Sequence, residues 1–313
     1  MAVSRTLQNF VWIGVIVLAT QALSACGGGK SSTKTNRSGR GTPVVEPPRP
    51  SLIQGGLLWD NHWAVTGRRL PVDADTGEVI DNPVWALREV DPLTGERNTA
   101  SGWVTWQCTT CHGWDYRGAD GNYGPGSGRY TGFPGIYDRI DGLTRDYVRQ
   151  YLRNGIPDPA DPTQRLHNFG TGPPGLSDDQ IESLILFLFD RQSGLIDTSQ
   201  YLFEQQFRGT VRDRDRRAVN GATVYESSPT AEAPACGSES CHGPTGTNID
   251  FIDGDPASTP NAFLGTVAAD DPWRALHKIR FGQPGLPEMT PVLGWNDIET
   301  AVDILAYLQS LPQ

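Results

Sequence analysis

The sequence is poor in the residues that most often carry chemistry. Its 313 residues include five cysteines, five histidines and two methionines. Nothing in it resembles a hydrolase triad, a phosphate-binding loop or a dinucleotide-binding fingerprint. These absences direct attention to the few cysteines and histidines, and to the residues that stand beside them.

A hydrophobic run that could cross a bilayer comfortably is also missing from the N-terminus. The apolar stretch 11–19 is shorter than the roughly 20 residues that a spanning helix needs. It follows Arg5 and precedes Leu-Ser-Ala-Cys at positions 23–26, which resembles a bacterial lipobox. We therefore predict a lipoprotein signal peptide over residues 1–25, cleavage before Cys26 and lipidation of its thiol. An ordinary signal peptide or an uncleaved anchor are the alternatives.

Residues 26–50 are rich in Gly, Ser, Thr and Pro, which favours a flexible tether. Residues 1–50 hold six basic residues and one acidic residue, a net charge of +5. Because the whole chain has a net charge of −10, residues 51–313 carry −15. This balance argues against nucleic acid and favours redox partners with basic docking surfaces. We expect an exported bacterial protein, held at the membrane by Cys26, that faces the periplasm or lies on the outer membrane.

Two cysteine pairs are each followed directly by histidine. Two residues lie between Cys108 and Cys111, ahead of His112, and four residues lie between Cys236 and Cys241, ahead of His242. Covalent haem attachment uses two thiols at short spacing, and the adjacent imidazole binds the iron. The sequence thus predicts two covalently bound haem c groups. A disulfide between Cys236 and Cys241 is the alternative at the second site.

The distal ligands are predicted from what remains. Met1 leaves with the signal peptide, so Met289, seven residues after Gly282, is the methionine available for the second iron. For the first iron the corresponding loop offers His167. His62, or an iron left open or bound to water, are the alternatives there. His62 is expected to be a surface or packing residue, and His277 to pack or face water.

The two halves repeat one order: attachment site, helix, glycine, ligand loop and terminal helix. Apolar periodicity and capping residues predict helices at 54–63, 144–154, 181–189, 220–225 and 298–308, and one capped by Asp271 and ended by Gly282. Two turn-like strings, 73–78 and 91–96, predict β-hairpin turns. Trp103, Trp106, Trp114 and Tyr116 flank the first site and are expected to pack on the porphyrin.

With these motifs the chain resembles a tandem of class I cytochrome c domains. The resemblance implies an all-α fold with each helical domain wrapped around a haem. Domain 1 would span residues 51–196, with an irregular or β-hairpin insertion at 64–101. A linker would follow at 197–219, its arginines forming a solvated face, and domain 2 would span 220–313.

The expected function is that of a dihaem c-type cytochrome with no bond-making catalytic residue. Electrons would pass between redox partners, from a low-potential His/His haem to a higher-potential His/Met haem. The alternative is an enzyme similar to dihaem thiosulfate dehydrogenases or peroxidases, with a displaceable ligand at the first haem. A tethered subunit of a larger complex is a third possibility.

Replacing Cys26 with alanine tests the lipoprotein hypothesis. Because the thiol would be the only site for the lipid, we expect the C26A protein in the soluble periplasmic fraction, while an S32A variant in the same tether stays with the membrane. Fractionation followed by haem staining measures this. Membrane retention of C26A would contradict lipidation as the anchor.

Overall fold

The computed structural model describes residues 50–160, 162, 165–170, 175–205, 208–227, 235–249, 263–284, 289, 291 and 297–312. Cys26 and the predicted signal peptide lie outside the described residues. Within them the protein is mainly helical, and its strands form two short antiparallel hairpins. No described helix is both long and apolar enough to span a bilayer.

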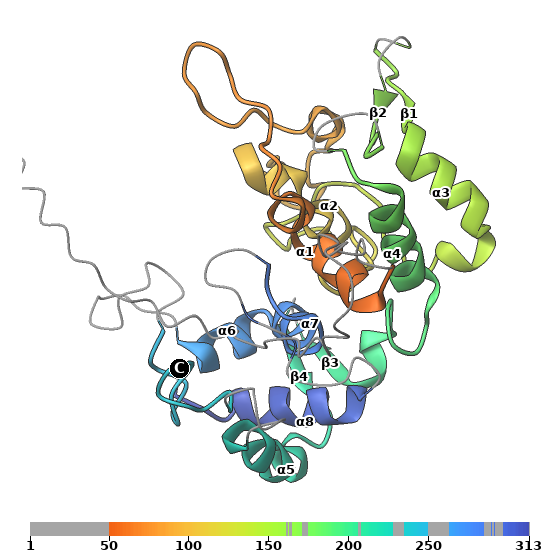
Figure 1. Cartoon of the computed structure of the whole chain (residues 1–313). Coiled ribbons are helices and arrows are strands. Elements are labelled where there is room, and N and C mark those ends of the chain that lie inside the picture. Colours follow the sequence, from red (N-terminus) through yellow and green to blue (C-terminus); the bar gives the residue numbers. More distant parts are fainter. Residues whose placement is uncertain are drawn as a thin grey trace, which may run out of the picture.

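The first lobe contains four α-helices and one hairpin, in the upper part of Figure 1. They are α1 (Leu52–Thr66), α2 (Cys108–His112), α3 (Arg145–Asn154) and α4 (Asp178–Phe189), with β1 (Ile156–Pro157) paired to β2 (Arg165–Leu166). Short 3-10 helices lie at Pro83–Leu87, Gly102–Trp106, Ile140–Gly142 and Thr198–Gln200. Helix α1 crosses α4 closely, because a Cβ on Gly55 would lie 2.1 Å from the Ser183 carbonyl oxygen.

The second lobe repeats this crossing with different helices. It contains α5 (Arg214–Glu226), α6 (Leu264–Asp270), α7 (Pro272–Phe281) and α8 (Ile298–Leu308), with β3 (Leu202–Gln205) paired to β4 (Arg208–Val211). Helices α5 and α8 run side by side at the bottom of Figure 1. A Cβ on Gly221 would lie 2.0 Å from the Asp303 carbonyl oxygen. Each lobe therefore brings its first and last helix together at a glycine.

The capping residues explain where several helices begin and end. The Ser177 side chain accepts from Gln180 N–H and the Gln180 side chain accepts from Ser177 N–H, a complete capping box. Asp271 accepts from Arg274 N–H ahead of Pro272, the first residue of α7. The predicted helices at 181–189 and 298–308, and the helix between Asp271 and Gly282, are confirmed.

Other boundaries differ from the prediction. Helix α5 begins at Arg214 rather than at 220, and the region 197–219 contains the β3–β4 hairpin instead of a plain connection. Helix α6 was not predicted. The arginines of this region do not all form a solvated face. Arg217 is largely buried and forms ion pairs with Asp303 and Glu299, both at 2.7 Å. These ion pairs join α5 to α8.

The insertion before α2 contains the two predicted hairpin turns. Bridges join Val72 to Val79 and Val90 to Arg97, so both turn predictions are confirmed. The carboxylate of Asp91 closes the second turn through Leu93 N–H and also accepts from Gly126 N–H at 2.8 Å. This second bond fastens the insertion to the loop that follows α2.

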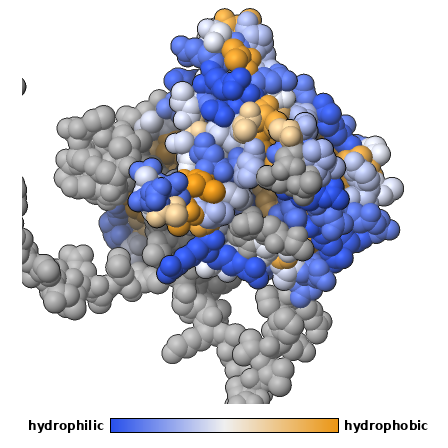
Figure 2. Space-filling model, turned by 90° about the horizontal axis from the view of Figure 1, so that it is seen from above, coloured by the Kyte–Doolittle hydropathy of each residue, from blue (hydrophilic) through white to orange (hydrophobic). Residues whose placement is uncertain are grey.

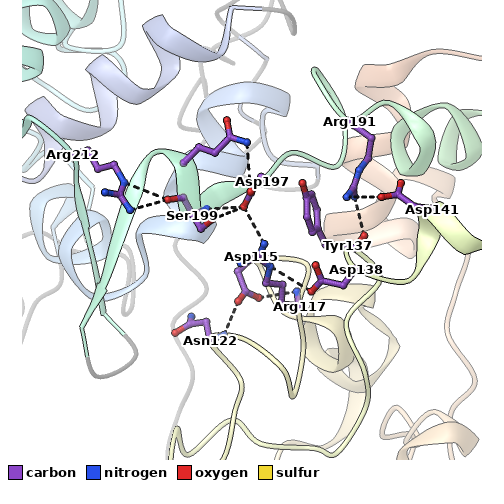
Figure 3. Close-up of polar contacts among 11 residues, drawn as sticks. Asp115, Arg117, Asn122, Tyr137, Asp138, Asp141, Arg191, Asp197, Ser199 and Arg212 are labelled. Atoms are coloured by element: carbon purple, nitrogen blue, oxygen red, sulfur yellow. Dashed lines mark hydrogen bonds and ion pairs between the residues drawn. The ribbon is translucent and has the colours of Figure 1, made fainter.

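Ion pairs hold the connection between the lobes against the first lobe. Arg117 binds the Asp197 carboxylate at 3.0 Å, and the Arg212 guanidinium donates to the Ser199 carbonyl oxygen (Figure 3). Arg191 donates to the Tyr137 carbonyl oxygen at 2.9 Å, beside the same cluster. Arg117 therefore ties the connecting segment to the first lobe, and Arg212, which directly follows β4, ties it to the β3–β4 hairpin.

The lobes meet where α7 lies against α1. His277 of α7 is 1% exposed, its Nδ1 lies 2.9 Å from the Tyr116 hydroxyl and its Nε2 lies 3.0 Å from the Gly56 carbonyl oxygen. Lys278 forms an ion pair with the buried Asp60. A Cβ on Gly56 would lie 2.3 Å from the Phe281 ring, so the helices approach closely. His277 is therefore a packing residue, which was one of the two possibilities expected from the sequence.

The face shown in Figure 2 is mostly hydrophilic, with hydrophobic residues in small, separate groups. Among the exposed apolar side chains are Val72, Val90 and Leu93 of the insertion, the last being 74% exposed. Single exposed apolar residues of this kind are ordinary on protein surfaces.

The glycines at the helix crossings give a stability prediction. Gly55→Ala and Gly221→Ala place a methyl group on a backbone carbonyl, so each should lower the free energy of unfolding by about 1–3 kcal/mol. Gly142→Ala is the matched control, because nothing lies within 4 Å of its Cβ position. Denaturant unfolding measures all three. Equal stability of the three variants would contradict the close crossings.

Candidate functional site

A cavity of about 440 Å³ lies inside the first lobe. Its walls come from α1, α2, α3 and α4 and are mostly aliphatic and aromatic. Cys108, His112, His167 and His62 all line it, and Arg139 is also on the wall. Cys111 belongs to the same helix α2 but does not line the cavity. An apolar space with imidazoles on its walls suits a flat porphyrin and its iron.

His112 is oriented by a hydrogen bond on the side away from any metal. Its Nδ1 lies 2.7 Å from the Pro134 carbonyl oxygen, which can only accept. Nδ1 therefore carries the proton, and Nε2 keeps its lone pair for a metal. Gly113 follows at φ 74°, where a Cβ would lie 2.5 Å from Asp115 Oδ1, so the chain turns sharply after the histidine.

His167 lies across the cavity from His112. The two ring centres are 6.1 Å apart, with the ring planes inclined by 72°. Two imidazoles that bind one metal from opposite sides have ring centres about 6 Å apart, since each nitrogen lies about 2.0–2.1 Å from the metal. The distance therefore fits an iron between them, and this is the observation on which the fit of a haem rests.

Burial keeps these imidazoles neutral. It lowers the pKa of His167 to about 3, with further lowering by the neighbouring His112 and His62. It also lowers the pKa of His62 to about 4, and that of His112. Neutral imidazole is the form that coordinates metals. Burial likewise raises the pKa of the Cys108 thiol to about 12, so the free thiol stays protonated.

The aromatic lining differs from the sequence prediction. None of Trp103, Trp106, Trp114 and Tyr116 lines this cavity, and Trp103 is 48% exposed. Besides the histidines, the aromatic residues that line the cavity are Trp59, Tyr147, Tyr151 and Phe169. The spacing of Tyr147 and Tyr151, four residues apart in α3, is the signal that could have identified two of them.

His62 is not a surface residue, contrary to one of its expectations. It is 1% exposed and sits in the wall of the first cavity, and its ring contacts Phe169 with centres 5.2 Å apart. The structure therefore brings three histidines together in one cavity. His112 and His167 were predicted as ligands from the sequence, and His62 was the alternative ligand.

A second, smaller cavity of about 70 Å³ lies in the second lobe. Cys236, His242 and Met289 line it together, although 47 residues separate His242 from Met289 in the sequence. Helix α7 contributes Arg274, Ala275, Lys278 and Ile279 to the wall. Aliphatic side chains of α6 and α8 form another part of it. The three residues expected to serve one iron thus share one pocket.

The two ligand loops use the same backbone device. Gly155 and Gly282 have φ values of 62° and 83°, and a Cβ on either would lie 2.1 Å from a carbonyl oxygen of the returning chain. That oxygen belongs to Leu166 in the first lobe and to Met289 in the second. His167 directly follows Leu166. Glycine is required because only it tolerates both the positive φ and the close approach.

The second cysteine pair is not closed on itself. Cys236 carries a free thiol, whereas Cys241 is disulfide-bonded, so the two are not joined to each other. The structure therefore gives no support to the Cys236–Cys241 disulfide. Cys241 does not line the second cavity. One sulfur atom cannot hold both a disulfide and a haem, so haem attachment at Cys241 requires its thiol form, with the disulfide reduced.

The α1–α7 contact connects the neighbourhoods of the two cavities. Trp59 lines the first cavity, and its ring centre lies 5.9 Å from that of His112 and 5.7 Å from that of Tyr116. Tyr116 bonds His277 of α7, and the next residue, Lys278, lines the second cavity. A short series of packed rings therefore leads from one cavity to the wall of the other.

Comparison with protein families agrees with this geometry. Residues 101–190 match the family model described as cytochrome c, a segment that contains Cys108, His112 and His167. The match supports a c-type cytochrome with covalently bound haem c and haem-based electron transfer. Searches of curated proteins and of solved structures returned no match.

Counting haems per chain tests the second attachment site. We expect two covalent haems in the exported protein and one in a C236A/C241A variant, because each pair of thiols holds one porphyrin. Intact-protein mass spectrometry measures both. The matched variant C108A/C111A should also keep one haem. A single haem in the unaltered protein, lost in C108A/C111A, would contradict attachment at the second pair.

Proposed function

We propose that the protein is a membrane-tethered dihaem c-type cytochrome built from two tandem cytochrome c-like domains. It transfers electrons between redox partners in the periplasm or at the outer membrane. Electrons pass from a low-potential haem with His112 and His167 as ligands to a higher-potential haem with His242 and Met289. The observation that carries the proposal is that each of two neighbouring cavities is lined by a pair of residues able to bind one iron.

The ligand sets support the order of potentials. A bound haem supplies a one-electron iron couple, and methionine ligation raises its potential relative to ligation by two histidines. His112 and His167 face one cavity at a separation that fits two axial imidazoles. Met289 faces the other cavity with His242. The protein's own part is to orient these ligands, exclude water and set the distance between the sites.

The tether and the charge support the location and the partners. Lipidated Cys26 would hold the protein at the membrane, and the basic residues of 26–50 would favour anionic headgroups. The excess of acid in residues 51–313 would favour partners with basic docking surfaces, with an attraction that weakens as salt increases. No bond-making residue is needed for this activity.

An enzyme with a displaceable ligand at the first haem is the second candidate. One observation favours it: Nδ1 of His167 is buried and has no hydrogen-bond partner, whereas Nδ1 of His112 has one. A ligand histidine without such a bond is less firmly oriented. Carbon monoxide separates the two functions. Unchanged visible spectra of the reduced protein support the carrier, and a change in about half of the haem supports the enzyme.

Replacing Met289 tests the ligand assignment of the second haem. We expect Met289→Ala to lower the potential of one haem markedly and leave the other in place, because methionine ligation raises the potential. A spectroelectrochemical titration of both haems measures this. Leu93→Ala is a control, since Leu93 is 74% exposed on the insertion and lines neither cavity. Two unchanged potentials in M289A would remove Met289 from the ligand set.

A further inference from the structure

His62 is a buried imidazole in the wall of the first cavity. If His112 and His167 are the two ligands of the iron, His62 has no function in the site. It is 1% exposed, and neither of its ring nitrogens has a hydrogen-bond partner in the structure. An unsatisfied buried polar group costs about 1–3 kcal/mol. A native protein that retains such a group generally has a use for it. A metal in the same cavity would supply the missing partner.

A break in α1 sets the position of this side chain. Asn61, directly before His62, has φ −155° and ψ 82°, which are not helical values. Its side-chain oxygen accepts from Ala64 N–H at 3.1 Å and so caps a new helical segment. Asn61 is itself buried. His62 is thus the first residue of a separately capped turn, and it faces the cavity from there.

His62 lies close to the expected distal ligand. The Phe169 ring contacts both imidazoles, with centres 5.2 Å from His62 and 4.8 Å from His167. The two imidazole centres are therefore no more than 10 Å apart. A change of side-chain rotamer in a histidine moves its ring nitrogens by several ångströms, so both rings can serve one metal position in turn.

The backbone conformation of His167 and the lack of a hydrogen bond at its Nδ1 favour a ligand that can dissociate from the iron. Its φ of 58° lies in the left-handed region, which is costly for a residue with a side chain. Its Nδ1 is buried without a partner, whereas Nδ1 of His112 bonds Pro134. The proximal histidine is therefore held by a second bond and the distal one is not.

We propose that His62 is a second distal ligand for the iron of the haem that Cys108 and Cys111 would attach and His112 would coordinate. It binds the iron when His167 is removed or displaced. In the exchange one iron–nitrogen bond breaks and another forms between neutral imidazoles and iron, with no electron or proton transferred. The inference rests on the proposed function, because it requires a haem in the first cavity.

The spin state of the ferric protein tests this exchange in the full-length, haem-loaded chain. We expect His62→Ala to keep the low-spin spectrum of the unaltered protein, and His167→Ala to stay low-spin as His62 replaces the lost ligand. The double variant H62A/H167A should show one high-spin haem per chain. Visible absorption and electron paramagnetic resonance measure this. The control L93A/H167A should remain low-spin, since Leu93 is exposed on the insertion and lies outside the cavity.

Two results would overturn the inference. One is a high-spin haem in H167A with His62 intact. The other is a low-spin double variant, which would mean that a different side chain replaces His167. Added imidazole should restore the low-spin spectrum of H62A/H167A, which shows that its pocket is intact. A second pair, H167G and H62F/H167G, asks the same question with the packing at position 62 retained.

Haem content separates failure of this inference from failure of the proposed function. A chain that holds no haem at Cys108 and Cys111, by mass spectrometry, contradicts the proposed function. A high-spin haem in H62A alone contradicts His167 as the resting ligand. A fully loaded H167A that is high-spin contradicts the role of His62 while leaving the electron-transfer proposal in place.

Discussion

The burial of α7 against α1 is the contact on which the arrangement of both cavities depends. The Gly56 backbone lies against Phe281, and His277 uses both ring nitrogens to bond Tyr116 and the Gly56 carbonyl oxygen. Lys278 completes the contact through the buried Asp60. Because α1 also lines the first cavity and α7 also lines the second, the same contact sets how far apart the two sites lie.

A haem in the first cavity would meet walls that are already largely apolar. Apolar side chains exclude water, so electrostatic interactions inside are stronger than in solvent and the histidines stay neutral. His112 is held by its bond to Pro134, while His167 and Met289 lie in loops that pass a glycine at close range. A firmly held His112 together with a less constrained His167 would suit a haem site whose potential depends on the second ligand.

Much of the helical framework could be predicted from the sequence, because periodic apolar residues and caps act over a few residues. Ser177 with Gln180, and Asp271 with Pro272, identified two helix starts directly. Helix α6 and the β3–β4 hairpin were missed because tertiary contacts stabilise them. Gln309 of the segment after α8, for example, bonds Val211, Gly209 and Ala268. Arg217 was misread for the same reason: its carboxylate partners lie more than 80 residues away.

The sequence by itself determined the chemistry available: two cysteine pairs with adjoining histidines, Met289 and His167 in corresponding loops, and an acidic chain after a basic N-terminal segment. These features follow from residue identity and short spacing along the chain, which do not depend on how the chain folds. Only the tertiary structure decided which rings enclose the first cavity, that His62 is buried in its wall, and that α7 joins the two lobes. Such facts depend on which helix faces meet, and residues such as Gly56 and His277, 221 positions apart, become neighbours only when the chain has folded.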